Sequence, residues 1–306
     1  MASILLCLLI TACATPQQTI DLKISPPNIP VSMELKSVPF YPQRDYQCGP
    51  AALASVINHG QIQTSPEDLL PLVYIPALKG SLQVEMLAAT SQFDRLSVQL
   101  DPKLSVVLRE VAAGNPVLIL QNLGFEAYPF WHYAVVIGYD LQNQEIILRS
   151  GEIERLIRPF SVFERTWQRS DFWAVAVVPP DVIPITVPED SYVRAIVDFE
   201  NKASRPAIQR AYQTAVQRWP QNYLLHMGRG NAAYALGHYA QAQQAFEYAT
   251  RIQPERSEAW NNLAYALSRQ GDRAGALTAV EQAILLAPDN SDLLENHREI
   301  SKKYSF

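Results

Sequence analysis

Cysteine is scarce in this chain, with three residues among 306. Two of them, Cys7 and Cys13, lie in the opening apolar stretch Ile4–Cys13, so Cys48 is the one thiol in the body of the chain. A single cysteine forms neither a disulfide scaffold nor a cysteine-rich zinc site. The low count therefore excludes both kinds of cross-linked fold.

Positive charge is also in short supply. The chain has 25 Lys and Arg against 30 Asp and Glu, a net charge of -5, which gives no basic field for nucleic acid. Beyond the opening stretch no apolar run is long enough to cross a membrane. The length suits two domains of ordinary size.

The opening stretch has the features of an export signal. It is too short to span a bilayer and ends in small residues. Its last four residues, Ile10–Cys13, resemble the lipobox of bacterial lipoproteins, which implies cleavage before Cys13 and lipidation of that cysteine. We expect a signal at 1–12 and a lipid anchor in the bacterial cell envelope, at the outer membrane facing the periplasm. Because residues 1–3 carry no Lys or Arg, a buried segment of a cytosolic protein is the alternative.

Prolines mark the boundaries that follow. Residues 13–35 are polar and contain four prolines, which predicts an extended tether. A second cluster, at Pro179, Pro180, Pro184 and Pro188, predicts a linker over 179–190. The chain then divides into a domain at 36–178 and another at 191–306.

The second domain repeats itself. Pro220, Pro254 and Pro288 are 34 residues apart, which is the period of the tetratricopeptide repeat. Gly237 and Gly271 mark turns between paired helices, although the first unit lacks such a glycine. Residues 291–303 suit the capping helix that a repeat stack needs. We expect an all-α solenoid that binds a protein partner or presents a substrate.

Cys48 lies where a turn meets a helix. Gly49 permits a sharp bend, Pro50 suits a first helical turn, and good helix formers follow. Backbone N–H groups at a helix N-terminus favour an anion, so this position is expected to lower the pKa of the thiol and activate it as a nucleophile.

The sequence around this thiol resembles a known family. The segment Gln43–Ala54, the later segment Phe130–Val136, and the intervening Gly80–Leu82 and Asn115–Leu120 follow the order found in papain-like peptidases that process bacteriocin leaders. The similarity covers about residues 36–178. It implies an α+β papain-like fold, hydrolysis of peptide bonds, and a narrow cleft that accepts small residues such as glycine before the cut.

His132 is the candidate general base. Of the five histidines, three lie in the repeats, and His59 lies about 16 Å along the helix from Cys48. His132 instead opens an almost wholly apolar strand. A histidine at the mouth of a buried strand suits a thiol on a neighbouring helix.

The group that orients His132 is less defined. If the strand turns at residues 141–143 and returns over 145–150, residues near 150 to 152 lie beside His132. The family resemblance implies an aspartate or asparagine there, but the chain has Ser150, Gly151 and Glu152. Ser150 is favoured by position, and Glu152 or a water is the alternative. Asp140 lies roughly 26 Å along the strand and is excluded.

Gln43 is the candidate oxyanion donor. The resemblance implies a glutamine six residues before the nucleophile, and Gln43 is five before it, with Gln47 as the alternative. In the expected mechanism, Cys48 attacks a carbonyl, Gln43 and the Cys48 N–H hold the oxyanion, and His132 protonates the leaving amine. These steps use no metal or organic cofactor.

Three functions fit this site. The first is a lipid-anchored cysteine endopeptidase. The second is a binding protein whose peptidase-like domain has lost turnover, which the missing acidic residue suggests. The third is an acyl or amide transferase that uses the same Cys-His pair. The fold is common to all three and does not choose among them.

Overall fold

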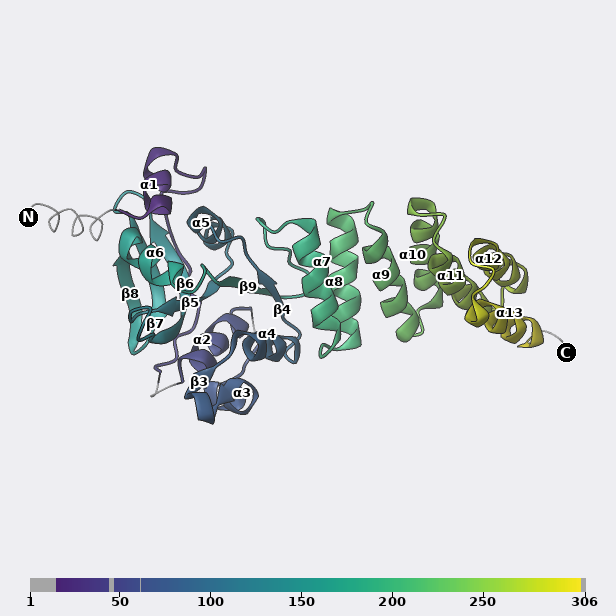
Figure 1. Cartoon of the computed structure of the whole chain (residues 1–306), viewed down its shortest axis with the longest axis horizontal. Coiled ribbons are helices and arrows are strands. Elements are labelled where there is room, and N and C mark those ends of the chain that lie inside the picture. Colours follow the sequence, from purple (N-terminus) through teal and green to yellow (C-terminus); the bar gives the residue numbers. More distant parts are fainter. Residues whose placement is uncertain (1–14, 44–46, 61, 304–306) are drawn as a thin grey trace, which may run out of the picture. The chain divides into compact units, whose positions relative to one another are not determined.

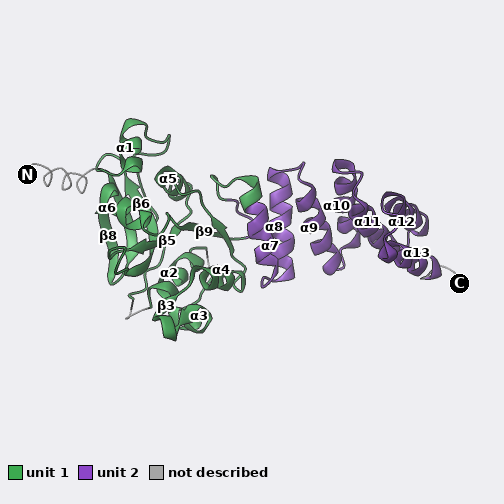
Figure 2. Cartoon of the chain, viewed as in Figure 1, with its two compact units in different colours: residues 1–179, 184–191 green, residues 180–183, 192–306 purple. Residues whose placement is uncertain are grey.

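The structure is a computed structural model that describes residues 15–43, 47–60 and 62–303 (Figure 1). It divides into two compact units (Figure 2). Unit 1 comprises residues 1–179 and 184–191, and unit 2 comprises residues 180–183 and 192–306. The division falls within the proline-rich segment. Cys7 and Cys13 lie outside the described residues.

Unit 1 is built on a seven-stranded antiparallel sheet. Its order is β4-β9-β5-β6-β7-β8, and β1 pairs with β6 beyond the end of β5. The strands are β1 (Ser32–Glu34), β4 (Leu96–Gln99), β5 (Val117–Asn122), β6 (Trp131–Asp140), β7 (Glu145–Ser150), β8 (Ile153–Pro159) and β9 (Ala174–Val178). β5 and β6 are rich in Val, Ile and Leu and almost wholly buried, as a continuous apolar run predicts.

The longest strand, β6, contains a bulge. Its pairing with β7 shifts between Val136 and Gly138. β1 passes so close there that a Cβ on residue 138 would lie 2.6 Å from the carbonyl oxygen of Met33. Only glycine admits this approach, so the sequence Ile137–Gly138 fixes where β1 joins the sheet.

Helices cover both sides of the sheet. Figure 1 shows α2 and α4 on one side and α5 and α6 on the other. The helices of this unit are α1 (Gln17–Ile24), α2 (Cys48–Ile57), α3 (Pro66–Val73), α4 (Gln83–Ser91), α5 (Leu104–Ala112) and α6 (Phe160–Gln168). A small second sheet pairs β2 (Tyr74–Ile75) with β3 (Gly80–Ser81), with the 3-10 turn η2 (Pro76–Leu78) between them.

The main core lies between α2 and the sheet. Nine of the ten residues of α2 are buried. Leu53, Val56 and Ile57 pack in one cluster with Tyr133, Val135 and Ile137 of β6 and with residues of β5, β7 and β9. Burial of these side chains holds the N-terminus of α2, and therefore Cys48, beside the start of β6.

The extended tether expected over residues 13–35 is not what the structure shows for its described part. Residues 17–24 form α1, which contacts α5 and α6. The buried carboxylate of Glu164 accepts hydrogen bonds from the backbone N–H groups of Gln18 and Thr19 and from the Thr19 hydroxyl. These bonds satisfy free N–H groups at the start of the helix, so the polar segment folds against the domain.

Part of the predicted linker is also bound to unit 1. The buried carboxylate of Glu110, on α5, accepts hydrogen bonds from the backbone N–H groups of Ile185 and Thr186 and from the Thr186 hydroxyl. Asn115 donates to the same carboxylate. This explains why residues 184–191 belong to unit 1.

Unit 2 consists of paired helices. They are α7 (Glu189–Glu200), α8 (Arg205–Arg218), α9 (Tyr223–Ala235), α10 (Tyr239–Ile252), α11 (Ser257–Gln270), α12 (Arg273–Leu286) and α13 (Ser291–Lys303), the first of which starts in unit 1. Equivalent hydrogen bonds recur with the 34-residue period. The rings of His226 and Trp260 each hydrogen-bond the carbonyl of a proline six residues earlier, at 2.9 Å. Where the first unit lacks the turn glycine, Ser204 caps α8.

The expected order of an α+β domain followed by an all-α repeat region is therefore confirmed. Within the described part of the chain, no helix has the length and apolar content needed to traverse a bilayer.

Candidate active site

Cys48 is the first residue of α2. It is a free, half-buried thiol that packs against the core below it. Its sulfur is hydrogen-bonded by the backbone of Tyr133, of Gly49 and of Cys48 itself. Tyr133 directly follows His132 in β6, so the structure brings the predicted nucleophile to the start of the strand that carries the predicted base.

The prediction that the helix N-terminus lowers the pKa of the Cys48 thiol is wrong in direction. Burial raises the pKa of Cys48 above its ordinary value, and the three backbone hydrogen bonds, which favour the thiolate, do not offset that effect. The sequence pattern identified the N–H donors correctly but could not show how far the sulfur is withdrawn from water. Cys48 is therefore a neutral thiol at rest.

His132 is bound to Ser150. The Nε2 atom of His132 lies 2.9 Å from the Oγ atom of Ser150, and both side chains are buried. When Nε2–H donates to this hydroxyl, Nδ1 keeps the lone pair that a general base needs. Burial lowers the pKa of His132 to about 4, so the ring is neutral at physiological pH.

The turn after β7 decides which of the two candidates, Ser150 or Glu152, orients the ring of His132. Ser150 ends β7, and Gly151 takes a left-handed conformation with φ of 62°. The chain reverses into β8, and Glu152 is exposed at the turn. A hydroxyl, rather than the carboxylate of Glu152, thus contacts the imidazole. The β6–β7 hairpin that the sequence predicted produces this contact.

Gln43 lies next to the same turn. Its backbone N–H donates a hydrogen bond of 3.1 Å to the carbonyl of Gly151, and its side chain is half-buried. Gln47 precedes α2 at the N-cap position and is also half-buried. The residues between them, 44–46, lie outside the described part of the chain. Gln43 is therefore placed beside the residue that follows Ser150, and its role as an oxyanion donor stays a prediction.

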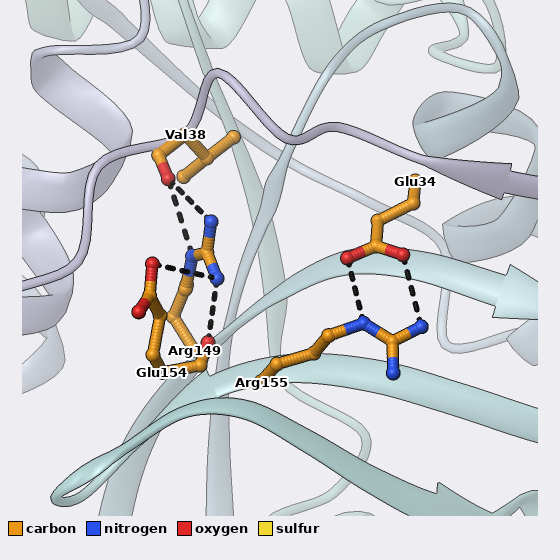
Figure 3. Close-up of polar contacts among 5 residues, drawn as sticks. All are labelled: Glu34, Val38, Arg149, Glu154 and Arg155. Carbon is orange, nitrogen blue, oxygen red and sulfur yellow. Dashed lines mark hydrogen bonds and ion pairs between the residues drawn. The ribbon is translucent and has the colours of Figure 1, made fainter.

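A buried arginine, Arg149, binds the segment that leads to Gln43 and Cys48 (Figure 3). Arg149 donates from Nε and Nη2 to the carbonyl of Val38, at 3.1 and 2.9 Å, and from Nη1 to the carbonyl of Glu154 at 2.6 Å. The Glu154 carboxylate lies 3.8 Å from Nη1. Figure 3 also shows a second, exposed pair, in which Arg155 binds both carboxylate oxygens of Glu34.

Arg149 is a residue that the sequence analysis missed. It attaches the segment leading to Gln43 and Cys48 to the hairpin that carries Ser150. A signal was present, because an arginine that directly follows the apolar run Ile146–Leu148 in a buried strand must find hydrogen-bond acceptors. Its position next to Ser150 did not reveal which segment it would bind.

Ser81 was also missed as a neighbour of the nucleophile. A Cβ on residue 49 would collide with the hydroxyl of Ser81, so the glycine after Cys48 is required by close packing. The carbonyl of Ser81 accepts a hydrogen bond from the Tyr133 hydroxyl at 3.2 Å. The Gly80–Leu82 motif thus forms β3 and the N-cap of α4, and it lies against the start of α2.

His59 is placed away from the site. Its Nε2 atom lies 2.9 Å from the carbonyl oxygen of Gly114, at the far end of α2 from Cys48. Among the described residues, no cluster of three or more His, Cys, Asp or Glu side chains is positioned to bind a metal ion.

A segment of each unit matches a known protein family. Residues 35–174 match the Peptidase_C39 like family, and residues 228–292 match the tetratricopeptide repeat family. None of the curated proteins compared with the chain matches it.

Solved structures resemble one unit or the other. A C39-like peptidase from Bacillus anthracis is 18% identical, with 48% of this chain and 97% of that chain covered and a TM-score of 0.41. The first repeat domain of Spaghetti (RPAP3), bound to an HSP90 peptide, is 17% identical, with coverages of 39% and 94% and a TM-score of 0.37. The TPR2B domain of yeast Sti1 is 17% identical, with coverages of 38% and 97% and a TM-score of 0.35.

Proposed function

Because the chain contains a Peptidase_C39-like domain followed by tetratricopeptide repeats, we propose that it is a cysteine endopeptidase whose repeats recruit a protein partner or substrate. The observation that carries the proposal is that the starts of α2 and β6 and the end of β7 lie together. The backbone of Tyr133 contacts the sulfur of Cys48, and the preceding residue, His132, is oriented by Ser150.

The first step starts from neutral groups. The Cys48 sulfur attacks the carbonyl carbon of a peptide bond while His132 Nδ1 takes the thiol proton, and the carbonyl electron pair moves to the oxygen. Ser150, which accepts from Nε2–H, keeps the ring oriented while the imidazolium forms. Gln43 and the Cys48 N–H stabilise the oxyanion.

The second half of the reaction reverses these transfers. The C–N bond breaks, and the imidazolium gives its proton to the leaving amine. Water then attacks the thioester and passes a proton to His132. The C–S bond breaks, and the sulfur recovers that proton. Every proton and electron pair in these reaction steps is held by substrate, water or this chain's own side chains.

The mature protein, in this proposal, is held at the membrane by a lipid on Cys13 and acts in the bacterial cell envelope, at the outer membrane and facing the periplasm. The repeat helices carry amide side chains that link every second helix, Asn231 of α9 with Asn262 of α11 and Asn261 of α11 with Asn296 of α13. Amides of this kind suit contacts with the backbone of a partner polypeptide.

One observation favours a second candidate. A protonated thiol and a hydroxyl in place of a carboxylate also suit a domain that binds peptides without cleaving them. The two candidates are separated by incubating the full chain and its Cys48→Ala and His132→Ala variants with a proteome-derived peptide library. A His238→Ala variant, which changes an exposed histidine of unit 2, serves as the control.

New peptide termini that require Cys48 and His132 but not His238 would support the endopeptidase. Peptides retained by the wild type and by both site variants, with no new termini, would support the binding protein. Addition of hydroxylamine separates hydrolysis from acyl transfer, because a transferase would form hydroxamates at the expense of carboxylates.

A further inference from the structure

The first helix, α1, is fixed to unit 1 at its first turn. The buried carboxylate of Glu164, on α6, accepts hydrogen bonds of 2.9 and 2.7 Å from the backbone N–H groups of Gln18 and Thr19. The Thr19 hydroxyl donates a third, of 2.6 Å. Hydrogen bonds to a carboxylate are stronger than those to a neutral acceptor. Thr19 and Leu22 are both buried, so the inner side of α1 also packs against the domain.

The side chain of Gln18 joins α1 to a second helix. Its Oε1 atom accepts a hydrogen bond from the N–H of Leu104, the first residue of α5. Its Nε2 atom donates to the carbonyl of Pro102 at 3.1 Å. The N–H groups at a helix start have no partner within their own helix. Gln18 and Glu164 thus each satisfy such groups across a contact between helices, and α1 is held to both α5 and α6.

This attachment leaves little chain between α1 and Cys13. Gln17, the first residue of α1, is four positions after Cys13, and four extended residues span at most about 14 Å. The tether expected over residues 13–35 would span about 75 Å by the same rule. A lipid on Cys13 therefore keeps the start of α1, and with it the start of α5, close to the bilayer surface.

The surface beside the start of α1 has little affinity of its own for lipid. Residues 101–103, which lead into α5, are exposed. They contain one acidic and one basic side chain, Asp101 and Lys103, paired at 4.0 Å, and no large apolar one. Binding to a lipid surface needs apolar side chains or a net positive charge. The length of chain after Cys13, rather than adhesion, thus sets the distance from the membrane.

The candidate active site lies on the other side of the sheet. α1 contacts α5 and α6, and Figure 1 shows these helices on the opposite side of the sheet from α2, whose first residue is Cys48. A domain of the size of unit 1 is roughly 40 Å across. Cys48 is then within about 55 Å of the bilayer, with the sheet between its helix and the lipid.

We propose that the α1 side of unit 1 is the surface that lies against the membrane, held there by the short connection to Cys13. The substrates are then polypeptides in the aqueous layer beside the membrane, and segments inside the bilayer are out of reach. This inference rests on the proposed function in taking a lipid on Cys13. It replaces a long tether with a fixed orientation.

The test attaches the chain to a membrane chemically, so that it does not depend on lipidation in cells. The mature chain, residues 13–306, contains every described residue. In a Cys48→Ala background its remaining thiol, that of Cys13, is coupled to phosphatidylcholine vesicles that contain a maleimide lipid. The photocrosslinker p-benzoylphenylalanine replaces either Lys103 or Val84, which is 64% exposed on α4. Mass spectrometry then measures how much of each protein is crosslinked to lipid.

We expect crosslinking to lipid to be about tenfold greater from position 103 than from position 84. A second variant carries about twenty Gly and Ser residues between Ala14 and Thr15, which leaves the contacts of α1 intact. Crosslinking from position 103 should fall about tenfold in this variant, because the effective concentration falls as the connection lengthens. The same insertion after Phe306 is the matched control and should change nothing.

Equal crosslinking from positions 103 and 84 would overturn the proposal, because no face of unit 1 would then be fixed. Crosslinking from position 103 that survives the insertion before Thr15 would also overturn it, because the short connection would not be the cause. Absence of lipid on Cys13 in cells would reject the anchor of the proposed function, and absence of cleavage would reject the peptidase. Neither result alters the crosslinking of the coupled chain, which measures the orientation alone.

Discussion

His132 Nε2 and Ser150 Oγ lie 2.9 Å apart in the interior of unit 1. The imidazole of the candidate base is thus oriented by a neutral hydroxyl. A hydroxyl fixes the tautomer of the ring but contributes no negative charge to stabilise an imidazolium. The arrangement explains why burial lowers the pKa of His132 to about 4 without opposition from a carboxylate.

The hydroxyl of Ser150 is expected to position the base. Ser150→Ala should lower kcat/KM about tenfold, the loss typical of one hydrogen bond. Ser150→Asp should move the acid limb of the kcat/KM profile to higher pH, because a carboxylate favours the protonated ring. Glu152→Gln is the matched control and should leave both unchanged. A larger effect of Glu152→Gln than of Ser150→Ala would show that the turn rearranges and that Glu152 is the orienting group.

The thiol of Cys48 should react slowly in the absence of substrate. Because burial raises its pKa, alkylation by iodoacetamide at pH 7.5 should be slower for the folded chain than for the chain in urea. Mass spectrometry of the peptide that contains Cys48 distinguishes it from Cys7 and Cys13. Faster labelling of the folded chain, with a midpoint of the labelling rate below pH 8.5, would contradict the raised pKa. It would support the preformed thiolate that the position of Cys48 at a helix N-terminus suggested.

His132 should make the first unit less stable in acid. Its pKa is about 4 when folded and 6.5 ordinarily, so only the unfolded chain is protonated at this residue between those values. The free energy of unfolding therefore falls as the pH falls from 6.5 to 4, by up to about 3 kcal/mol. Urea unfolding of the wild type and of His132→Gln across this range measures the effect. Parallel pH profiles of the two proteins would contradict the lowered pKa.

Arg149 should contribute more to stability than Arg155 does. Arg149→Met leaves the buried carbonyl of Val38 without its two donors and should cost about 3 kcal/mol of unfolding free energy. Arg155→Met removes an exposed pair with Glu34 and should cost about 1 kcal/mol or less. Urea titrations of the two variants provide the comparison. Equal losses would mean that Arg149 does not fasten the segment before Cys48.

Much of the architecture could be predicted from local patterns. The 34-residue period, the buried strand after His132 and the helix after Cys48 depend on spacing and propensity, which are visible in the sequence. The contact between His132 and Ser150 followed from counting across one hairpin. These features are short-range, so the sequence alone constrained them.

Features that depend on long-range packing could not be predicted. The carboxylate of Glu164 on α6 binds the backbone of Gln18 and Thr19, 146 and 145 positions away in the chain, and folds residues 17–24 onto α6, although the prolines there suggested an extended tether. The raised pKa of Cys48 depends on what covers the sulfur, and the binding of Val38 by Arg149 joins segments 111 residues apart. No periodicity or motif encodes such pairings.

The most direct test of the account is to digest a proteome-derived peptide library with the full chain and to sequence the new N-termini, beside the Cys48→Ala and His132→Ala variants. The account predicts a defined set of new termini that is lost in both variants and restored when wild-type chain is added. An identical set of termini from wild type and Cys48→Ala would contradict the assignment of Cys48 as the nucleophile, and with it the proposed peptidase.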